Sequence, residues 1–305
     1  MQVRFAARTQ QVIVAPVRVL EVIQRSASFL QTRGVESPRL QIEWILAHTL
    51  RIPRLQLYLQ FDRLLDAATL DRIRSAVQRR GQREPLQHIL GTAPFCGLEL
   101  EVSRAVLVPR PETELLAEQA WTWLHLHFPP GSPKPQVLDW GTGSGCLALA
   151  VATHHPAAQI TAIDISPESL AVANRNAQRL QLESRIVFIE SAGTSRLPPE
   201  SRFHLVVSNP PYIPSQDIAS LEPEVRDHDP VLALDGGPDG LTAYRTIAHS
   251  LPRHLDPRGV LLLALGDNQA PGVSRILVEA GWIVLEVRPD HSGRERFLAA
   301  QIARS

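Results

Sequence analysis

The chain has 305 residues, of which 44% are hydrophobic, and its 31 basic side chains balance 31 acidic ones. Such a chain can bury a substantial core, and one large domain beside a smaller one is expected. No stretch is long and apolar enough to cross a bilayer, and residues 1–17 lack a signal-peptide core, so we expect a flexible extension and a cytoplasmic protein without membrane contact. Cys96 and Cys146 have no paired spacing, so no metal site or disulfide scaffold is expected.

The charges are unevenly distributed along the chain. Residues 1–90 contain fourteen arginines and seven acidic residues, a net charge of +7, so residues 91–305 carry −7. A basic amino-terminal part would attract an acidic protein or a nucleic acid, and salt would weaken that attraction. Arginines that only coat exposed helix faces explain the same excess, and the sequence leaves both explanations open.

Residues 18–84 are predicted to form a small helical domain. Ser37-Pro38 is typical of a helix start, and the apolar spacing that follows predicts one buried helix face with Leu40, Trp44, Ile45 and Ala47-His48. A further helix is predicted from Leu65 to Arg80. We interpret the apolar positions of these helices as core.

Residues 85–108 change to alternating apolar residues with glycines, which is typical of a β-hairpin that joins two domains. The large domain is expected to span residues 109–305. It opens with Arg110-Pro111-Glu112-Thr113-Glu114, a typical helix start, because proline fits the first turn and the acidic residues favour the helix dipole.

A glycine turn follows the apolar strand that begins at Val137. Glycines let a ligand lie against the backbone, and the helix that begins after the turn adds a favourable dipole. The dinucleotide fingerprint fits poorly, because Cys146 stands where glycine or alanine is needed unless the fingerprint is shifted, so a nicotinamide enzyme is disfavoured. The turn consists of Gly141, Thr142, Gly143, Ser144 and Gly145.

The next predicted strand, residues 159–163, ends at Asp164. A carboxylate about twenty residues after such a turn can accept hydrogen bonds from both ribose hydroxyls of a nucleoside. A cap for the following helix is the alternative role of Asp164, but Ser166-Pro167 suits that task better. We therefore predict that Asp164 binds a ligand.

From the glycine turn onward, strands and helices alternate to the end of the chain. This alternation predicts an α/β domain with a doubly wound, mostly parallel seven-stranded sheet whose last two strands form an antiparallel hairpin. The acidic segment Pro214–Gly240 is predicted to be a long loop over the active-site mouth. The strands after the glycine turn are predicted at residues 159–163, 185–189, 203–207, 259–265, 282–287 and 295–302.

A rigid polar turn, Asn209-Pro210-Pro211-Tyr212, follows the strand at residues 203–207. Proline fixes its own φ and restricts the residue before it, so the turn is pre-shaped. It would hold the Asn209 side-chain oxygen and the Pro210 carbonyl as acceptors for two hydrogen bonds from one planar NH2 group. A Pro-Pro pair that merely ends a strand is the alternative, and the glycine turn and Asp164 argue against it.

Together the glycine turn, Asp164 and the Asn209 turn resemble the S-adenosylmethionine-dependent methyltransferases that modify planar amino groups. Within that superfamily the chain resembles the release factor glutamine methyltransferases over about residues 20 to 300. Because separated motifs occur in the right order, the resemblance is specific. The segments that carry it are Gly91 to Leu98, Val108 to Glu114, Asn209 to Pro214 and Ala233 to Leu241.

The resemblance implies a protein-glutamine N-methyltransferase with a substrate-recognising domain at residues 18–84. Its acceptor would be the glutamine of the Gly-Gly-Gln motif in class I peptide chain release factors, and its cofactor S-adenosylmethionine. Catalysis would fall to Asn209, Pro210 and Tyr212. The substrate would also contact Pro211, Phe95, Arg110 and Thr113, and the cofactor would contact Gly141, Thr142, Gly143, Ser144, Gly145, Asp164 and Asn209.

Other acceptors and functions remain open from the residues alone. A ribosomal-protein glutamine has the same chemistry, and the exocyclic amine of adenine in DNA or RNA presents the same planar donor. A DNA enzyme would need a large recognition region and a basic groove, whereas the catalytic part here is acidic, so direct nucleic-acid binding is not expected. A non-catalytic binder of nucleosides or RNA is a further alternative.

The chain departs from the family pattern in two places. Ser191-Ala192-Gly193 stands where relatives often have an acidic residue near the adenine, which leaves adenine recognition to backbone groups or apolar neighbours. Ala264-Leu265-Gly266 stands where a glutamate commonly precedes the glycine, which changes the support of the cleft.

Overall fold

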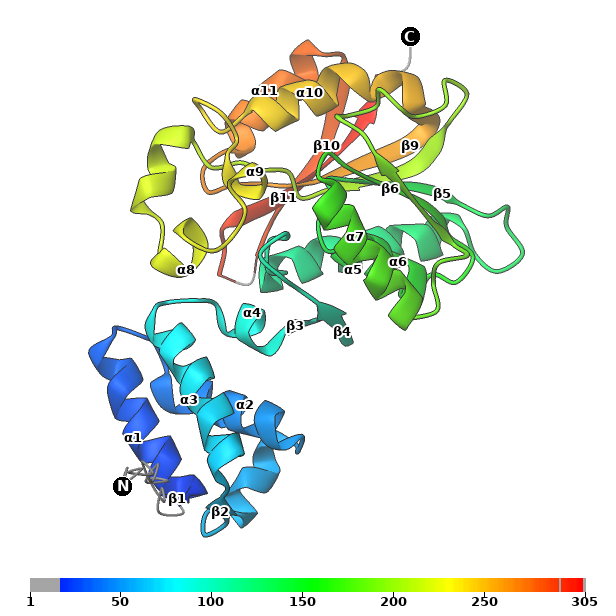
Figure 1. Cartoon of the computed structure of the whole chain (residues 1–305). Helices are drawn as coiled ribbons and strands as arrows, with labels where there is room; N and C mark the ends of the chain where they lie inside the picture. The colour runs from blue at the N-terminus through cyan, green and yellow to red at the C-terminus, as the bar shows by residue number, and fades with distance from the viewer. Residues whose placement is uncertain (1–16, 291, 304–305) are drawn as a thin grey trace, which may run out of the picture. The chain divides into compact units, whose positions relative to one another are not determined.

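The computed structural model describes residues 17–290 and 292–303. The chain divides into two compact units, residues 1–90 and residues 91–305 (Figure 1). All but the last residue of the expected extension at 1–17 lies outside the described residues. None of the described helices has the length and apolar character that a membrane span requires.

The first unit is mainly helical, as predicted. Its helices are α1 (Val19–Thr32), α2 (Pro38–Leu50), α3 (Ala67–Gly81) and α4 (Leu86–Leu90), with the 3-10 helix η1 (Arg54–Leu59). A short antiparallel pair, β1 (Val17–Arg18) and β2 (Leu64–Leu65), was not predicted.

Helix α3 begins two residues later than predicted. Leu65 pairs with Val17 in the short sheet, and Asp66 caps the helix by accepting a hydrogen bond of 2.7 Å from the Thr69 backbone N–H. The cap decides the start, because Asp66 satisfies one of the free N–H groups of the first turn.

The prediction for the buried face of α2 is confirmed only in part. Ile45 and Ala47 are buried in the core of this unit, whereas Leu40 and Trp44 are 42% and 44% exposed. The helix carries apolar residues on both faces, so spacing alone does not select one, and packing against α1 and α3 does. Leu40 and Trp44 are left at the surface.

The second unit contains the predicted seven-stranded sheet, in the order β10-β11-β9-β8-β5-β6-β7. Strands β5 to β9 run parallel, and the final pair is antiparallel, as predicted. The strands are β5 (Gln136–Trp140), β6 (Gln159–Asp164), β7 (Ile186–Glu190), β8 (Phe203–Ser208), β9 (Leu255–Ala264), β10 (Trp282–Pro289) and β11 (Glu295–Ile302). A separate hairpin precedes them, made of β3 (Thr92–Phe95) and β4 (Leu98–Glu101).

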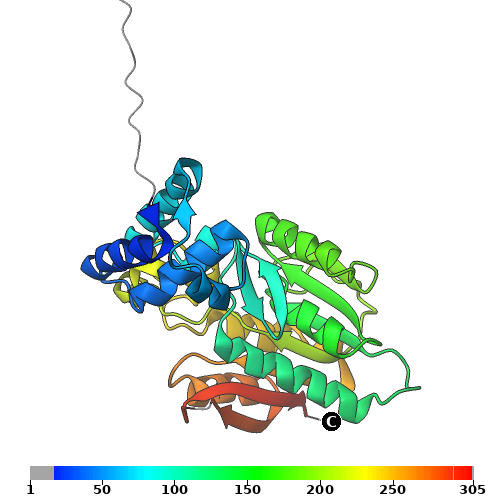
Figure 2. The ribbon, with the colours of Figure 1, turned by 90° about the horizontal axis from the view of Figure 1, so that it is seen from below.

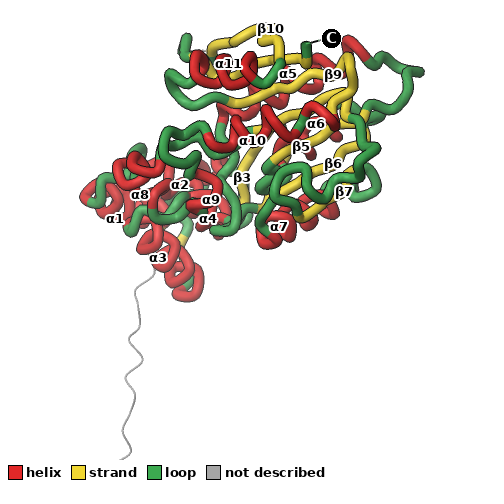
Figure 3. The backbone as a smooth tube through the Cα atoms, turned by 90° about the horizontal axis from the view of Figure 1, so that it is seen from above, coloured by secondary structure: helices red, strands yellow, loops and turns green. Residues whose placement is uncertain are grey.

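Helices cover both faces of the sheet. Successive strand residues point to opposite faces, so Val137 packs beneath α5 (Pro111–His127), α6 (Cys146–His154) and α7 (Pro167–Arg179). Leu138 faces the other core, which contains α10 (Thr242–Ser250) and α11 (Ala270–Glu279). Figure 2 looks toward the α5 side of this unit and Figure 3 toward the side of α10 and α11.

The segment Pro214–Gly240 is not the open loop that was predicted. It contains η2 (Ser215–Ser220), α8 (Pro223–Arg226) and α9 (Val231–Leu234). Backbone hydrogen bonds close it at its base, from the Ile213 N–H to the Leu234 carbonyl at 3.0 Å and from the Gly236 N–H to the Ile213 carbonyl at 2.8 Å. The sequence pattern missed these helices because each has only four to six residues, too few to show a periodic pattern.

The sheet topology brings the polar turns to one edge. Strand β5 lies between β6 and β8, so chain connections leave it in opposite directions, and ligands bind at such a switch point in open α/β sheets. The Ser208 hydroxyl donates a hydrogen bond of 2.7 Å to the Trp140 carbonyl and joins the ends of β8 and β5.

Candidate active site

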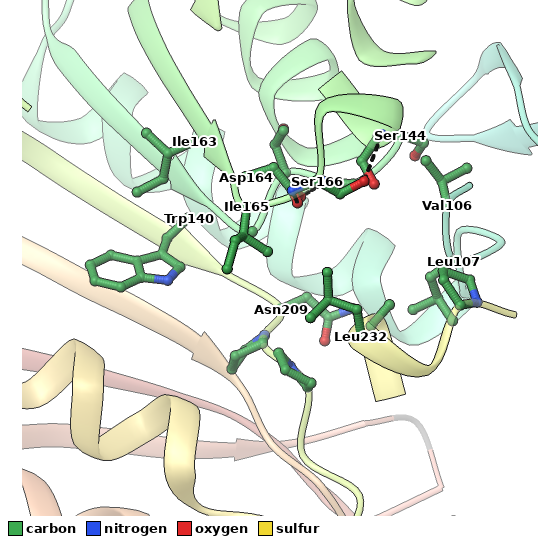
Figure 4. A pocket seen from close by; sticks show the side chains of 18 of the residues that line it. Val106, Leu107, Trp140, Ser144, Ile163, Asp164, Ile165, Ser166, Asn209 and Leu232 are labelled. Atoms are coloured by element: carbon green, nitrogen blue, oxygen red, sulfur yellow. Dashed lines mark hydrogen bonds between the residues drawn. The ribbon is translucent and has the colours of Figure 1, made fainter. Parts of the chain in front are cut away.

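Two cavities lie at the carboxyl edge of the sheet. The larger, about 370 Å³, is lined by the glycine turn and by the segments that follow β6, β7 and β8 (Figure 4). The smaller, about 290 Å³, is lined by Tyr212 and by side chains of the Pro214–Gly240 segment. Both are lined by Arg110, Thr113, Asn209 and Pro210. The arrangement suits two reactants that meet at the Asn209 turn.

Four of the five predicted residues of the glycine turn line the larger cavity. Gly141 and Gly143 have φ values of +75° and +55°, and no atom lies within 4 Å of the Cβ that either lacks. A ligand therefore has free access to the backbone there. Gly145 does not line the cavity, because a Cβ at this position would lie 3.2 Å from the Ala173 Cβ, so this glycine allows α6 to pack on α7.

Asp164 holds the glycine turn in addition to lining the larger cavity. Its Oδ2 accepts a hydrogen bond of 2.8 Å from the Gly143 N–H, and its Oδ1 accepts one of 2.9 Å from the Ser166 N–H. Ser166 caps α7 as predicted, since its hydroxyl accepts from the Ser169 N–H at 3.1 Å. Burial raises the pKa of Asp164 above its ordinary value, although its hydrogen bonds oppose the shift. Each oxygen keeps a second acceptor site for a ligand.

Asp139 is a buried acid that the sequence analysis did not single out. Its Oδ2 accepts hydrogen bonds of 2.6 Å from the Thr142 hydroxyl and 3.1 Å from the Ala148 N–H, and its Oδ1 has no partner among the described residues. Burial raises the pKa of Asp139 to about 7. An acid inside an apolar strand next to a glycine turn was the available signal, because acids are rarely buried without a role.

Thr113 orients the amide of Asn209. The Asn209 Nδ2 group donates a hydrogen bond of 3.2 Å to the Thr113 hydroxyl, although the two residues are 96 positions apart in the sequence. The Asn209 oxygen Oδ1 makes no hydrogen bond with any described residue. An acceptor without a partner thus remains at the wall that both cavities share.

The backbone at Tyr212 is held from two sides. The Gln269 side chain donates a hydrogen bond of 2.8 Å to the Tyr212 carbonyl and accepts one of 3.1 Å from the Gly266 N–H. On the other side, a Cβ at Gly236 would lie 2.8 Å from the Tyr212 Cα, so only glycine fits. Gln269 therefore supports the cleft beside the departure at Ala264-Leu265-Gly266.

Arg110 joins the start of α5 to the Pro214–Gly240 segment. Its guanidinium lies 2.6 Å from the Asp229 carboxylate, whose side chain is fully buried. Burial raises the pKa of Asp229 to about 6, and the Arg110 charge opposes this shift. Because Arg110 lines both cavities, the ion pair connects the walls of both cavities to the Pro214–Gly240 segment.

Phe95 lines neither cavity, so the expectation that it walls the target pocket is not met. It is 1% exposed and packs with Leu100 and Leu116 in the core beneath α5. Cys96 occupies the hairpin turn with φ of 49°. The burial of Phe95 follows from the alternation of side chains along β3, which places this side chain on the buried side of the hairpin.

The part of the chain that the structure describes contains no set of metal ligands. No group of three His, Cys, Asp or Glu side chains there is arranged to hold a metal ion. Burial raises the pKa of both Cys96 and Cys146 to about 12, so both remain thiols at neutral pH and neither is an activated nucleophile.

Two family models match the chain, the PrmC N-terminal domain over residues 21–91 and the Methyltransferase small domain over residues 121–222. A release factor glutamine methyltransferase from Geobacter sulfurreducens is 40% identical over 284 residues, which cover 93% of this chain and 96% of the relative. One from Rhodospirillum rubrum is 40% identical, covering 92% of this chain and 84% of the relative. The solved hMettl16 catalytic domain shares the fold, with a TM-score of 0.53, 14% identity and coverage of 80% and 86%. The chain therefore belongs to the release factor glutamine methyltransferase family.

Proposed function

We propose that this protein transfers a methyl group from S-adenosylmethionine to the side-chain amide nitrogen of the glutamine in the Gly-Gly-Gln motif of class I peptide chain release factors. The Asn209 Oδ1 atom carries the proposal, because it has no partner among the described residues and Asn209 lines both cavities. A glutamine side chain offers the planar NH2 group that such an acceptor binds. The family relationship supports the same acceptor.

The residues of the larger cavity fit S-adenosylmethionine. Its volume of about 370 Å³ lies in the range of small-molecule sites. Gly141 and Gly143 leave open space along the backbone, and Asp164 keeps acceptor sites for ribose hydroxyls. When bound there, the cofactor supplies an electrophilic methyl group on its sulfonium. We assign cofactor binding to Gly141, Thr142, Gly143, Ser144, Asp164 and Asn209.

The Asn209 turn orients the acceptor nitrogen. An amide nitrogen attacks poorly, because its lone pair is delocalised into the carbonyl. Two acceptors, the Asn209 oxygen and the Pro210 carbonyl, hold its NH2 group in line and favour the positive charge that develops on nitrogen. Thr113 keeps the Asn209 amide in the orientation that leaves its oxygen available.

We infer that the acceptor glutamine enters through the smaller cavity. Its wall is largely apolar, with Leu221, Val225 and Leu265, which excludes water from the reacting groups. Tyr212 lines it as well, and burial raises the pKa of its phenol above the ordinary value, so the group stays a neutral hydrogen-bond donor.

We assign substrate recognition to residues 18–84, which lie within the first unit. Its surface exposes several large apolar side chains, and residues 1–90 carry the net charge of +7. These side chains lie on α2 and on η1, the element that follows it, and exposed apolar side chains that gather in this way mark protein interaction sites. The apolar surface consists of Leu40, Trp44, Leu55, Tyr58 and Leu59. The proposed substrate acts in translation, so we place the enzyme in the cytoplasm.

The acceptor can be identified by product mapping. Purified protein is incubated with methyl-labelled S-adenosylmethionine and, separately, with class I release factors, ribosomal proteins and DNA, and labelled positions are found by mass spectrometry. We expect label on the glutamine of Gly-Gly-Gln and none on a release factor in which that glutamine is alanine. Label mainly on a ribosomal-protein glutamine or on adenine would overturn the proposal.

A further inference from the structure

We propose that Trp140 recognises the adenine base of S-adenosylmethionine in this protein, with its indole ring as a platform and its N–H group as a donor to a ring nitrogen. The inference rests on the proposed function, because it concerns the cofactor of that reaction. Adenine would then be recognised in this chain by a residue at the end of β5 and not by a residue of the segment after β7.

The segment after β7 offers no side chain for the base. Ser191 uses its hydroxyl locally, donating to the Gly193 carbonyl at 2.7 Å and accepting from the Arg196 N–H at 3.2 Å. Ala192 and Gly193 carry no polar side chain. Among the residues that line the larger cavity, only Arg110 and Asp164 are charged, and Asp164 is assigned to the ribose. No carboxylate is therefore available for the exocyclic amine.

The indole of Trp140 occupies the space above Gly193. A Cβ at Gly193 would lie 3.2 Å and 3.3 Å from the indole atoms Cζ2 and Cη2, and Gly193 also has φ of +69°. Any larger residue at 193 would displace the ring or strain the backbone. The aromatic side chain thus comes from the end of β5 and fills the volume that a side chain at 193 would need.

The N–H group of Trp140 lacks a partner although the residue is 91% buried, being 9% exposed. It makes no hydrogen bond with any residue that the structure describes. Trp282 provides the contrast, since it is only 3% exposed, lines neither cavity and donates a hydrogen bond of 2.9 Å to the Ala248 carbonyl. The Nε1 atom of Trp140 is not among the buried side-chain atoms that lack a partner, so it is accessible and a ligand atom in the cavity can accept its hydrogen bond.

Trp140 is positioned to contact a base in the larger cavity. It lines that cavity together with Ile163 and Ile165, and Figure 4 shows the indole beside these two side chains. Adenine has unprotonated ring nitrogens that accept hydrogen bonds and flat faces that pack on apolar side chains. An indole donor among aliphatic side chains matches both features.

The test measures equilibrium binding of S-adenosylhomocysteine to the full-length protein by calorimetry. Trp140→Phe keeps an aromatic ring and removes the donor, so we expect a Kd about 2- to 13-fold higher, the value of one hydrogen bond. Gly193→Ala leaves Trp140 unchanged but pushes on its ring, and we expect it also to weaken binding. Trp123→Phe on α5, outside both cavities, is the matched control and should bind as the wild type does.

Fluorescence provides a second readout, independent of methyl transfer. S-Adenosylhomocysteine should quench tryptophan emission in the wild type and in Trp123→Phe, and this quenching should be lost in Trp140→Phe. If the Trp140→Phe variant binds the ligand with the same Kd as the wild type and shows the same quenching, this inference is overturned and the proposed function stands. A wild-type protein that does not bind the ligand at all would overturn the proposed cofactor, and this inference with it.

Discussion

The contact between Thr113 and Asn209 allows the role of the turn to be tested with a double-mutant cycle. Asn209→Ala removes an oriented acceptor that strengthens as charge develops, so we expect kcat to fall about 100- to 1000-fold. Thr113→Val keeps the shape of the side chain but removes the hydroxyl that accepts from the Asn209 amide at 3.2 Å. Losing one such bond is worth about 0.5–1.5 kcal/mol, which corresponds to about a 2- to 13-fold lower kcat.

The double variant separates an effect through Asn209 from any other effect of Thr113. If Thr113 acts only by orienting the Asn209 amide, Thr113→Val should have almost no effect once Asn209 is alanine. The two changes are then strongly non-additive, as expected for residues in one hydrogen-bonded unit.

The assay is single-turnover methyl transfer to a purified release factor, with saturating S-adenosylmethionine so that binding differences do not enter. Circular dichroism and thermal unfolding check that each variant is folded. Additive losses in the double variant would refute the orienting role of Thr113. Near-normal turnover of a folded Asn209→Ala protein would refute the mechanism itself.

Three further perturbations test other parts of the structure. Gly236→Ala should destabilise the protein by about 1–3 kcal/mol and slow methyl transfer, because its Cβ would meet the Tyr212 backbone. Gly272→Ala is the control, because its Cβ would meet only the Leu241 side chain, and it should change neither stability nor rate. Thermal unfolding and turnover assays measure the two effects. Asp139 has its pKa raised from 3.8 to about 7, so its contribution to stability is complete below about pH 4 and is lost as the pH rises to about 7. The Tm of Asp139→Asn should therefore rise relative to the Tm of the wild type as the pH increases from about 4 to about 7. A difference in Tm that does not change with pH would contradict the raised pKa of Asp139. Trp44→Ala should raise KM for an intact release factor but not for a short Gly-Gly-Gln peptide, whereas Leu126→Ala, an exposed change on α5, should alter neither; an equal loss with the peptide would exclude a docking role.

Local chemistry allowed much of the second unit to be predicted. The Ser166 cap and the alternation of strands with helices depend on residues a few positions apart, and the structure contains both. Because parallel strands in such a sheet end at one edge, the motifs after β5, β6 and β8 could be expected to meet there. The predicted site residues Gly141, Asp164 and Asn209 do line one cavity.

Where local pattern allowed more than one arrangement, packing decided. Helix α2 has apolar residues on both faces, and only its contacts with α1 and α3 select Ile45 for the core and leave Trp44 exposed. The strand position of Phe95 did not reveal which side of the hairpin would be covered, and α5 covers the side that carries it.

The sequence by itself determined the succession of strands, the stiffness of the prolyl turn and the family of the chain, because each depends on short-range order along the backbone. Only the tertiary structure decided that Thr113 meets Asn209 and that the indole of Trp140 lies over Gly193. Contacts of this kind join residues about 50 to 100 positions apart and arise when the sheet and its helices are packed, since side-chain neighbours are selected by the shape of the whole core.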